Sequence, residues 1–153
     1  MALDQTSRPY IEATPEETVT AFLQALQDCD FSAVRALLAP DLAYTNVSLP
    51  TLRGGERVAR MLELALRRGG GFEVETHHIA VNGDTVLTER TDVVKLGPVH
   101  ARFWVCGTFQ VRDGQIVVWR DYFDWMALSR GVVRGIIGAV LPWQRLHRST
   151  RPR

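Results

Sequence analysis

The second half of the chain is divided into four strand-like runs that are rich in β-branched and aromatic residues. The runs are 72–80, 85–94, 101–111 and 116–123. Turn-forming residues separate them at 82–84 (Asn-Gly-Asp), at 95–98 and at 112–115 (Arg-Asp-Gly-Gln). Because such short turns join antiparallel neighbours, this pattern predicts a β-meander.

The first half of the chain predicts helices. Thr14 has the features of an N-cap, with Pro15 in the first turn and Glu17 completing a capping box. The apolar side chains that follow at helical spacing are Val19, Phe22, Leu23 and Leu26. A shorter helix is expected near 31–38, and it should end before Pro40.

A strand over 42–46 and a loop over 48–55 should precede a third helix. The inward side chains expected for that helix are Val58, Met61, Leu62 and Ala65. Three consecutive glycines at 69–71 should end it.

Helices followed by long antiparallel strands predict an α+β fold in which the helices cover one face of a curved sheet. The 153 residues suit one domain. We expect a lead-in over 1–13, the domain over 14–128 and a C-terminal tail over 129–153. A sheet curled around helices forms a cone with an apolar bottom, and polar side chains that point into it would lie in a pocket.

The composition is that of a soluble globular protein, with 46% hydrophobic and 23% charged residues. Cys29 and Cys106 are too few for a disulfide framework, and residues 1–10 lack the apolar core of a secretion signal. No run reaches the ~18 to 20 apolar residues of a membrane span. We therefore expect a cytoplasmic protein with reduced thiols.

The tail differs from the body in charge. Residues 125–153 contain six arginines and no acidic residue, which leaves residues 1–124 with a formal charge of −5. The body has no basic strip with interleaved aromatic residues, so nucleic acid is not an expected partner. The apolar segment 131–141 could touch a membrane surface, but its glycines make it a poor interfacial helix. We favour a lid over the pocket or a dimer contact.

Three predicted strands carry polar side chains in apolar surroundings: Tyr44 with Asn46, Arg90 with Asp92, and Asp121. Alternate residues of a strand share a face, so Arg90 and Asp92 point the same way. Val86 and Val94 lie on that face, and Phe123 shares the face of Asp121. Buried charges need partners, which favours convergence in one pocket. An ordinary ion pair on a solvated sheet face is the alternative.

Two carboxylates around one guanidinium in a dry pocket suit acid–base catalysis. Desolvation and like-charge repulsion would raise the pKa of one carboxyl group above ~3.9, so that it stays protonated and can act as an acid. The other carboxylate, held ionised by Arg90, could act as a base on a water molecule that Tyr44 and Asn46 position. This chemistry suits the addition of water to a strained, neutral electrophile such as an epoxide.

Three segments in register resemble the signature strands of the limonene epoxide hydrolase family. They are 44–46 (Tyr-Thr-Asn) followed by 49–50 (Leu-Pro), 88–93 (Thr-Glu-Arg-Thr-Asp-Val) and 119–124 (Trp-Arg-Asp-Tyr-Phe-Asp). The resemblance extends over about residues 14–128 and is to an actinobacterial, in particular a mycobacterial, member. It implies a highly curved, mixed but largely antiparallel sheet with helices in its concavity, which is the cone-shaped, cystatin-like or nuclear transport factor 2-like fold. It also implies a homodimer and a one-step hydrolysis with no covalent intermediate and no cofactor.

The resemblance gives each of the five polar residues a role. Asp92 would donate a proton to the epoxide oxygen, and Asp121 would take a proton from the attacking water. Arg90 would bridge the two carboxylates, while Tyr44 and Asn46 would hold the water. The positions that match the family's apolar substrate pocket are Leu23, Leu26, Val94, Val105, Phe123 and Leu128.

The small Ala65 and the long apolar tail would suit an epoxide larger than a monoterpene, such as a sterol or fatty-acyl epoxide. Two other functions suit the same scaffold: a ketosteroid isomerase-like or polyketide cyclase-like enzyme, and a non-catalytic module that binds an apolar ligand. The second carboxylate, with Arg90 between the pair, favours hydration. His77 and His78 face opposite sides of their predicted strand and lack further ligands, so no metal site is predicted.

Overall fold

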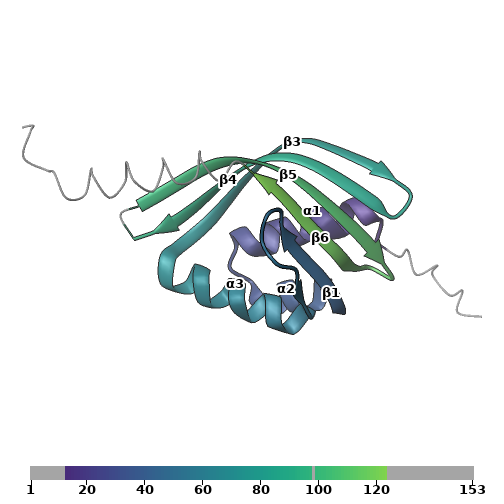
Figure 1. Cartoon of the computed structure of the whole chain (residues 1–153), viewed down its shortest axis with the longest axis horizontal. Helices are drawn as coiled ribbons and strands as arrows, with labels where there is room; N and C mark the ends of the chain where they lie inside the picture. The colour runs from purple at the N-terminus through teal and green to yellow at the C-terminus, as the bar shows by residue number, and fades with distance from the viewer. Residues whose placement is uncertain (1–12, 98, 124–153) are drawn as a thin grey trace, which may run out of the picture.

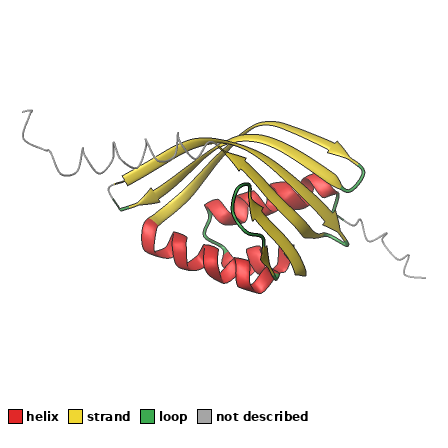
Figure 2. Cartoon of the chain, in the orientation of Figure 1, coloured by secondary structure: helices red, strands yellow, loops and turns green. Residues whose placement is uncertain are grey.

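The computed structural model describes residues 13–97 and 99–123. These residues form three helices and a six-stranded sheet that curves over them (Figure 1, Figure 2). In chain order the elements are α1 (Pro15–Gln27), α2 (Phe31–Leu37), β1 (Leu38–Asn46), β2 (Leu52–Arg53), α3 (Gly55–Gly69), β3 (Gly70–Asn82), β4 (Thr85–Leu96), β5 (Val99–Arg112) and β6 (Gln115–Phe123). The predicted α+β fold is therefore confirmed. The lead-in, Leu128 and the tail over 129–153 fall outside the described residues, apart from Ala13.

The strand order in the sheet is β2-β1-β6-β5-β4-β3. β3 to β6 form the predicted antiparallel meander, and β1 pairs with β6 in parallel. In the β5–β6 hairpin, Asp113 and Gly114 have φ values of 51° and 71°, the left-handed geometry that a tight turn of this kind needs. The parallel pairing places the first long strand of the chain directly beside the last one described.

α1 begins as the sequence predicts. The backbone N–H of Glu17 donates to Thr14 Oγ1 at 3.2 Å, and the N–H of Thr14 donates to Glu17 Oε2 at 2.8 Å, which completes the capping box. The helix lies under the sheet (Figure 1). Its predicted apolar stripe is buried: Val19, Phe22, Leu23 and Leu26.

The predicted inward face of α3 is wrong in part. Val58 is fully buried and Leu62 is half-buried, but Met61 and Ala65 are exposed, and Ala59 and Leu66 are buried in their place. The cause lies at the first turn of the helix, where a Cβ atom on Gly55 would be 2.4 Å from the carbonyl oxygen of Ala39. This close approach of α3 to β1 fixes the rotation of the helix and turns the 61/65 side outward.

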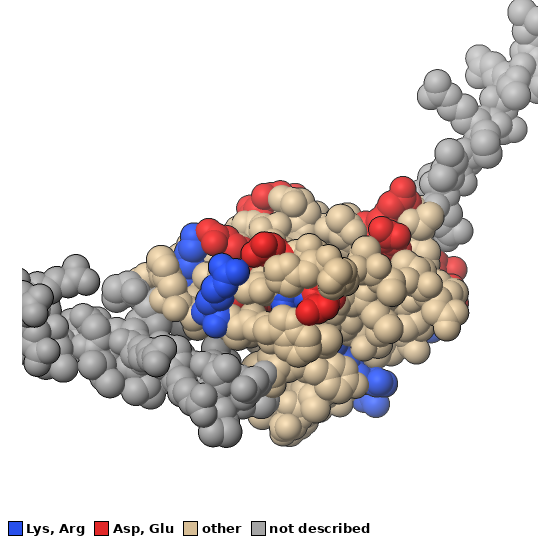
Figure 3. Space-filling model, turned by 90° about the horizontal axis from the view of Figure 1, so that it is seen from above, with Lys and Arg blue, Asp and Glu red and all other residues tan. Residues whose placement is uncertain are grey.

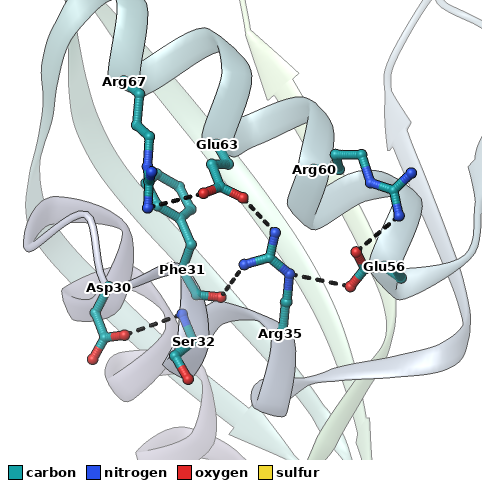
Figure 4. Close-up of polar contacts among 8 residues, drawn as sticks. All are labelled: Asp30, Phe31, Ser32, Arg35, Glu56, Arg60, Glu63 and Arg67. Atoms are coloured by element: carbon teal, nitrogen blue, oxygen red, sulfur yellow. Dashed lines mark hydrogen bonds and ion pairs between the residues drawn. The ribbon is translucent and has the colours of Figure 1, made fainter.

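Arg35 joins α2 to α3 (Figure 4). Its Nε donates to Glu56 at 3.1 Å, its Nη2 pairs with Glu63, and its Nη1 donates to the carbonyl oxygen of Phe31 at 3.1 Å. Arg67 also pairs with Glu63, and its guanidinium lies 5.6 Å from the centre of the Phe31 ring. The network holds the two helices together beneath the sheet.

Exposed polar side chains on the sheet pair with side chains on other strands, and Arg102 on β5 reaches across β4 to Glu75 on β3. Arg102 pairs with Glu75 at 3.2 Å, and the indole N–H of Trp104 donates to Glu89 at 3.0 Å. Seen from above, acidic and basic side chains lie beside one another (Figure 3). These charges are exposed to solvent, unlike the polar groups on the opposite face of the sheet, which lie against the core and need protein partners. Within the described residues, no helix is long and apolar enough to cross a membrane.

Candidate active site

The predicted polar residues meet on the concave face of the sheet, because strand register brings them together. Asn46 on β1 pairs with Asp121 on β6, and Asp121 in turn pairs with Gly107 on β5. Gly107 pairs with Thr88 on β4, so these residues form one row across four strands. Arg90 lies two residues beyond Thr88 on the same face of β4.

The charged side chains on this face of β4 and β6 are buried. Arg90 is 1% exposed, Asp92 is 4% exposed and Asp121 is 5% exposed. Val86 and Phe109, which are fully buried, belong to the core beside them. The alternative of an ion pair on a solvated face is therefore wrong. The three side chains form a buried ionic group whose charges need partners within the protein.

The Arg90 guanidinium supplies the donors of this group. Nε donates to both carboxylate oxygens of Asp92 at 3.0 and 3.2 Å, and Nη2 donates to Asp121 Oδ2 at 2.7 Å. Nη1 donates to the hydroxyl of Thr88 at 3.1 Å. The guanidinium carbon lies 5.8 Å from the centre of the Phe109 ring. One cation thus bridges two carboxylates through different nitrogens, as the sequence predicted.

Trp119 is a functional candidate that the sequence reasoning missed. Its indole Nε1 donates to Asp121 Oδ1 at 2.8 Å, so both oxygens of Asp121 accept a hydrogen bond from the protein. The indole ring also packs 4.3 Å from the ring of Tyr44, centre to centre. The two-residue spacing of Trp119 and Asp121 on a strand, which puts both side chains on one face, was the available signal.

Burial controls the protonation of the two carboxyl groups. It raises the pKa of Asp92 from its ordinary value of 3.8 to about 6, although Arg90 opposes this rise. Burial also raises the pKa of Asp121, and both Arg90 and Trp119 oppose it. Asp121 accepts from two separate donors, whereas Asp92 shares one N–H between its oxygens. Since hydrogen bonds from donors favour a charged carboxylate, Asp92 is better suited to hold a proton and Asp121 to remain ionised.

Arg90 remains a cation between the two carboxyl groups. Burial lowers its pKa, but the attraction of Asp121 and Asp92 outweighs burial, and the net shift is upward. The bridging charge is therefore present at any working pH.

Tyr44 and Asn46 border this group from β1, and both are half-buried. Burial, followed by the charge of Asp121, raises the pKa of the Tyr44 phenol above its ordinary value of 10.0, while a side-chain hydrogen bond with Asn46 opposes the rise. The phenol is therefore neutral at pH 7, and it can both donate and accept a hydrogen bond.

The residues predicted to line a substrate pocket occupy different depths. Val105 is fully buried and pairs with Arg90 across β4 and β5, while Val94 and Phe123 are half-buried. Leu23 and Leu26 belong to the hydrophobic core beneath the sheet. Their contact with a substrate stays a prediction.

The two neighbouring histidines lie on β3 with exposed side chains. The Nε2 atom of His77 is 2.8 Å from the hydroxyl of Thr91, and His78 lies 3.9 Å from Glu89. No group of three potential metal-binding side chains occurs among residues 13–97 and 99–123.

Comparison with known proteins shows the family to which the chain belongs. The family model for the limonene-1,2-epoxide hydrolase catalytic domain matches residues 13–134. The epoxide hydrolase EphG of Mycobacterium tuberculosis is 49% identical over 124 residues, which cover 81% of this chain and 83% of that protein.

Solved structures agree. An epoxide hydrolase of M. tuberculosis described as limonene epoxide hydrolase-like superposes with a TM-score of 0.77 at 48% identity, over 84% of this chain and 96% of that one. An NTF2-like protein of unknown function from Burkholderia pseudomallei gives a TM-score of 0.69 at 19% identity, over 78% of this chain and 98% of that one, which shows the shared fold alone. The resemblance inferred from three strand segments is thus confirmed, and the chain belongs to the limonene-1,2-epoxide hydrolase family.

Proposed function

We propose that the protein adds water to an apolar epoxide in one step and releases a vicinal diol, with no covalent intermediate and no cofactor. The observation that carries this proposal is the buried Arg90, which holds Asp92 at Nε and Asp121 at Nη2. Membership of the limonene-1,2-epoxide hydrolase family supports the same reaction.

In the proposed reaction Asp121 is the base. It accepts a proton from a water molecule that Tyr44 and Asn46 help to hold, and the water oxygen attacks one carbon of the epoxide. The carbon–oxygen bond of the ring breaks, and its electron pair stays on the epoxide oxygen. That oxygen takes the proton of Asp92, so the step gives a neutral diol.

The step leaves Asp92 ionised and Asp121 protonated. A proton must return to Asp92 before the next turnover, and the loss of a proton from Asp121 restores the base. Arg90 stays charged throughout and contacts both carboxyl groups. It therefore stabilises the negative charge on Asp121 before the step and on Asp92 after it.

We propose that Val94, Val105 and Phe123 line the apolar part of the substrate site, together with Leu23, Leu26 and Leu128. Ala65 does not support an enlarged pocket, because its side chain is exposed on α3. Terpene, sterol and fatty-acyl epoxides therefore stand as equal candidates. We also expect a homodimer on the basis of family resemblance, which sedimentation velocity would test, and a cytoplasmic location on the basis of the two cysteines and the polar residues 1–10.

The test is diol formation from a panel of terpene, sterol and fatty-acyl epoxides, with a single turnover in oxygen-18 water. We expect diol that carries the label in the first turnover, because water attacks directly, whereas an ester intermediate would first deliver an unlabelled enzyme oxygen. Asp92→Asn should abolish the product.

Asp113→Asn is the matched control, because Asp113 is exposed in the β5–β6 turn, where asparagine tolerates the positive φ. It should leave the rate unchanged. Absence of diol from every epoxide, or equal rates for Asp92→Asn and wild type, would reject the proposal. Isomerisation of a ketone or binding of a ligand without turnover would then be assayed.

A further inference from the structure

Gly107 lies in the interior of β5, the longest strand of the sheet, although glycine weakens a strand and offers no side chain to the core. Its φ lies outside the left-handed region, so other residues could adopt the same backbone conformation. Gly107 is buried on the concave face, where its neighbours Val105 and Phe109 both carry large buried side chains. The reason for a glycine here must therefore be space.

The space at Gly107 is occupied by the catalytic group. A Cβ atom on this residue would lie 2.2 Å from Arg90 Nη1, 2.6 Å from Thr88 Oγ1 and 2.9 Å from Phe109 Cε2. All three distances are shorter than real Cβ contacts allow. Of the three atoms, Arg90 Nη1 is the closest, and it is already fixed by its hydrogen bond to Thr88.

Strand register explains why the guanidinium passes over this position. Arg90 stands on β4 opposite Val105, whereas Asp121 stands on β6 opposite Gly107. The two strands lie on either side of β5, so the side chain must cross β5 diagonally to bring Nη2 within 2.7 Å of Asp121. The crossing runs over the backbone of Gly107.

We propose that Gly107 is a positioning residue of the active site: the missing side chain leaves the passage through which Arg90 reaches Asp121 across β5. The catalytic consequence rests on the proposed hydrolysis, whereas the passage itself does not. A methyl group at 107 would push the guanidinium away from Asp121. Asp92 lies on the same strand as Arg90, so the Asp92–Arg90 ion pair could be kept after this shift.

The first experiment compares Gly107→Ala with Thr108→Ala, its neighbour on the outer face of the same strand. We expect Gly107→Ala to lower kcat/KM at least 100-fold and to move the acidic limb of its pH profile upward, because Asp121 loses the cation that favours its ionised form. Thr108→Ala should change neither quantity more than twofold. A folded Gly107→Ala enzyme with wild-type rate and wild-type limbs would overturn the proposal.

The second experiment needs no activity, so it separates this proposal from the proposed reaction. Thermal unfolding is measured for Gly107→Ala, Arg90→Lys and the double variant, because lysine keeps the charge but has no Nη1 atom. We expect Gly107→Ala to lower Tm in both backgrounds, because Thr88 Oγ1 and Phe109 Cε2 are also too close to an added Cβ atom, but to lower it less in the Arg90→Lys background, where the closest clash is absent.

The double variant also decides the case in which Gly107→Ala does not fold. A recovered thermal transition supports the passage, and a double variant as unfolded as Gly107→Ala overturns it. Equal losses of Tm in both backgrounds would likewise overturn it. If the wild type forms no diol but the two backgrounds differ as expected, the passage stands and the hydrolase assignment fails.

Discussion

Asp92 and Asp121 contact one guanidinium through different nitrogens, although they belong to strands that are not neighbours in the sheet. Each carboxyl group therefore has its own surroundings, with a single shared donor at Asp92 and two separate donors at Asp121. This asymmetry is what an acid and a base need when both are aspartates in one buried site.

The free energy of unfolding should depend on pH because the pKa of Asp92 is raised. Because the folded state binds this proton more tightly than the unfolded state, the gain is complete below about pH 4 and is lost as the pH rises through about 6. The shift corresponds to about 3 kcal/mol at about 1.36 kcal/mol per pKa unit.

Asp92→Asn mimics the protonated form and keeps the pairing of Arg90 with Asp121. We expect it to be more stable than wild type at pH 7 by about 1–3 kcal/mol, and to lose the part of the pH dependence between about 4 and 6 that comes from Asp92. Urea unfolding at several pH values measures both quantities. A variant that is less stable than wild type at pH 7 would show that the ionised form is favoured in the folded protein.

The pH profile of kcat/KM should be bell-shaped, with the alkaline limb near an apparent pKa of about 6. The rate falls above this value because Asp92 must be protonated in the free enzyme. The two apparent values belong to the coupled pair of carboxyl groups. An alkaline limb above about pH 8 would contradict a pKa of about 6 for the Asp92 carboxyl group.

Trp119→Phe should change the protonation of Asp121. It removes the N–H that donates to Asp121 Oδ1, so we expect the acidic limb to move upward and kcat/KM to fall about 10-fold. Phe22→Leu is the control, because Phe22 packs edge-on against Trp119 at 5.1 Å without a hydrogen bond to the site. It should lower stability and leave the acidic limb in place. If the acidic limb of the kcat/KM profile lies at the same pH in Trp119→Phe and wild type, the indole contributes packing only.

Tyr44→Phe should lower the rate without moving either limb. The phenol is neutral over the working range, so its loss removes a group that positions water but no titrating group. We expect kcat to fall about 10- to 100-fold, since one positioned hydrogen bond in a transition state is worth about 1.5–3 kcal/mol. Unchanged kcat would remove Tyr44 from the proposed water site.

Local patterns predicted the elements well. The capping box at Thr14 and the turn at Asp113-Gly114 depend on neighbouring residues only, and both occur as expected. The face of α3 was predicted less well, because apolar residues lie on more than one side of that helix. Its rotation is set by the contact between Gly55 and the backbone of Ala39, which is distant in sequence.

Some residues of the candidate site could likewise be predicted from the local sequence, whereas others depend on contacts between distant strands. Arg90, Asp92 and Asp121 could be found because charges inside apolar strands need partners. Thr88, Gly107 and Trp119 were missed, since their roles depend on the register of β4 against β5 and of β5 against β6. Gly107 in particular has no chemistry of its own, and only the distance to Arg90 shows its importance.

The parallel pairing of β1 with β6 also has a consequence for synthesis of the chain. A growing chain contains Tyr44, Asn46, Arg90 and Asp92 before it contains Asp121, and until β6 inserts, β1 has only the two-residue β2 beside it. Insertion of β6 between β1 and β5 closes the sheet and supplies the second carboxylate in the same event. A chain that stops before β6 would therefore lack both a continuous sheet and the second carboxylate that contacts Arg90, so the buried ionic group is completed only when the sheet is complete.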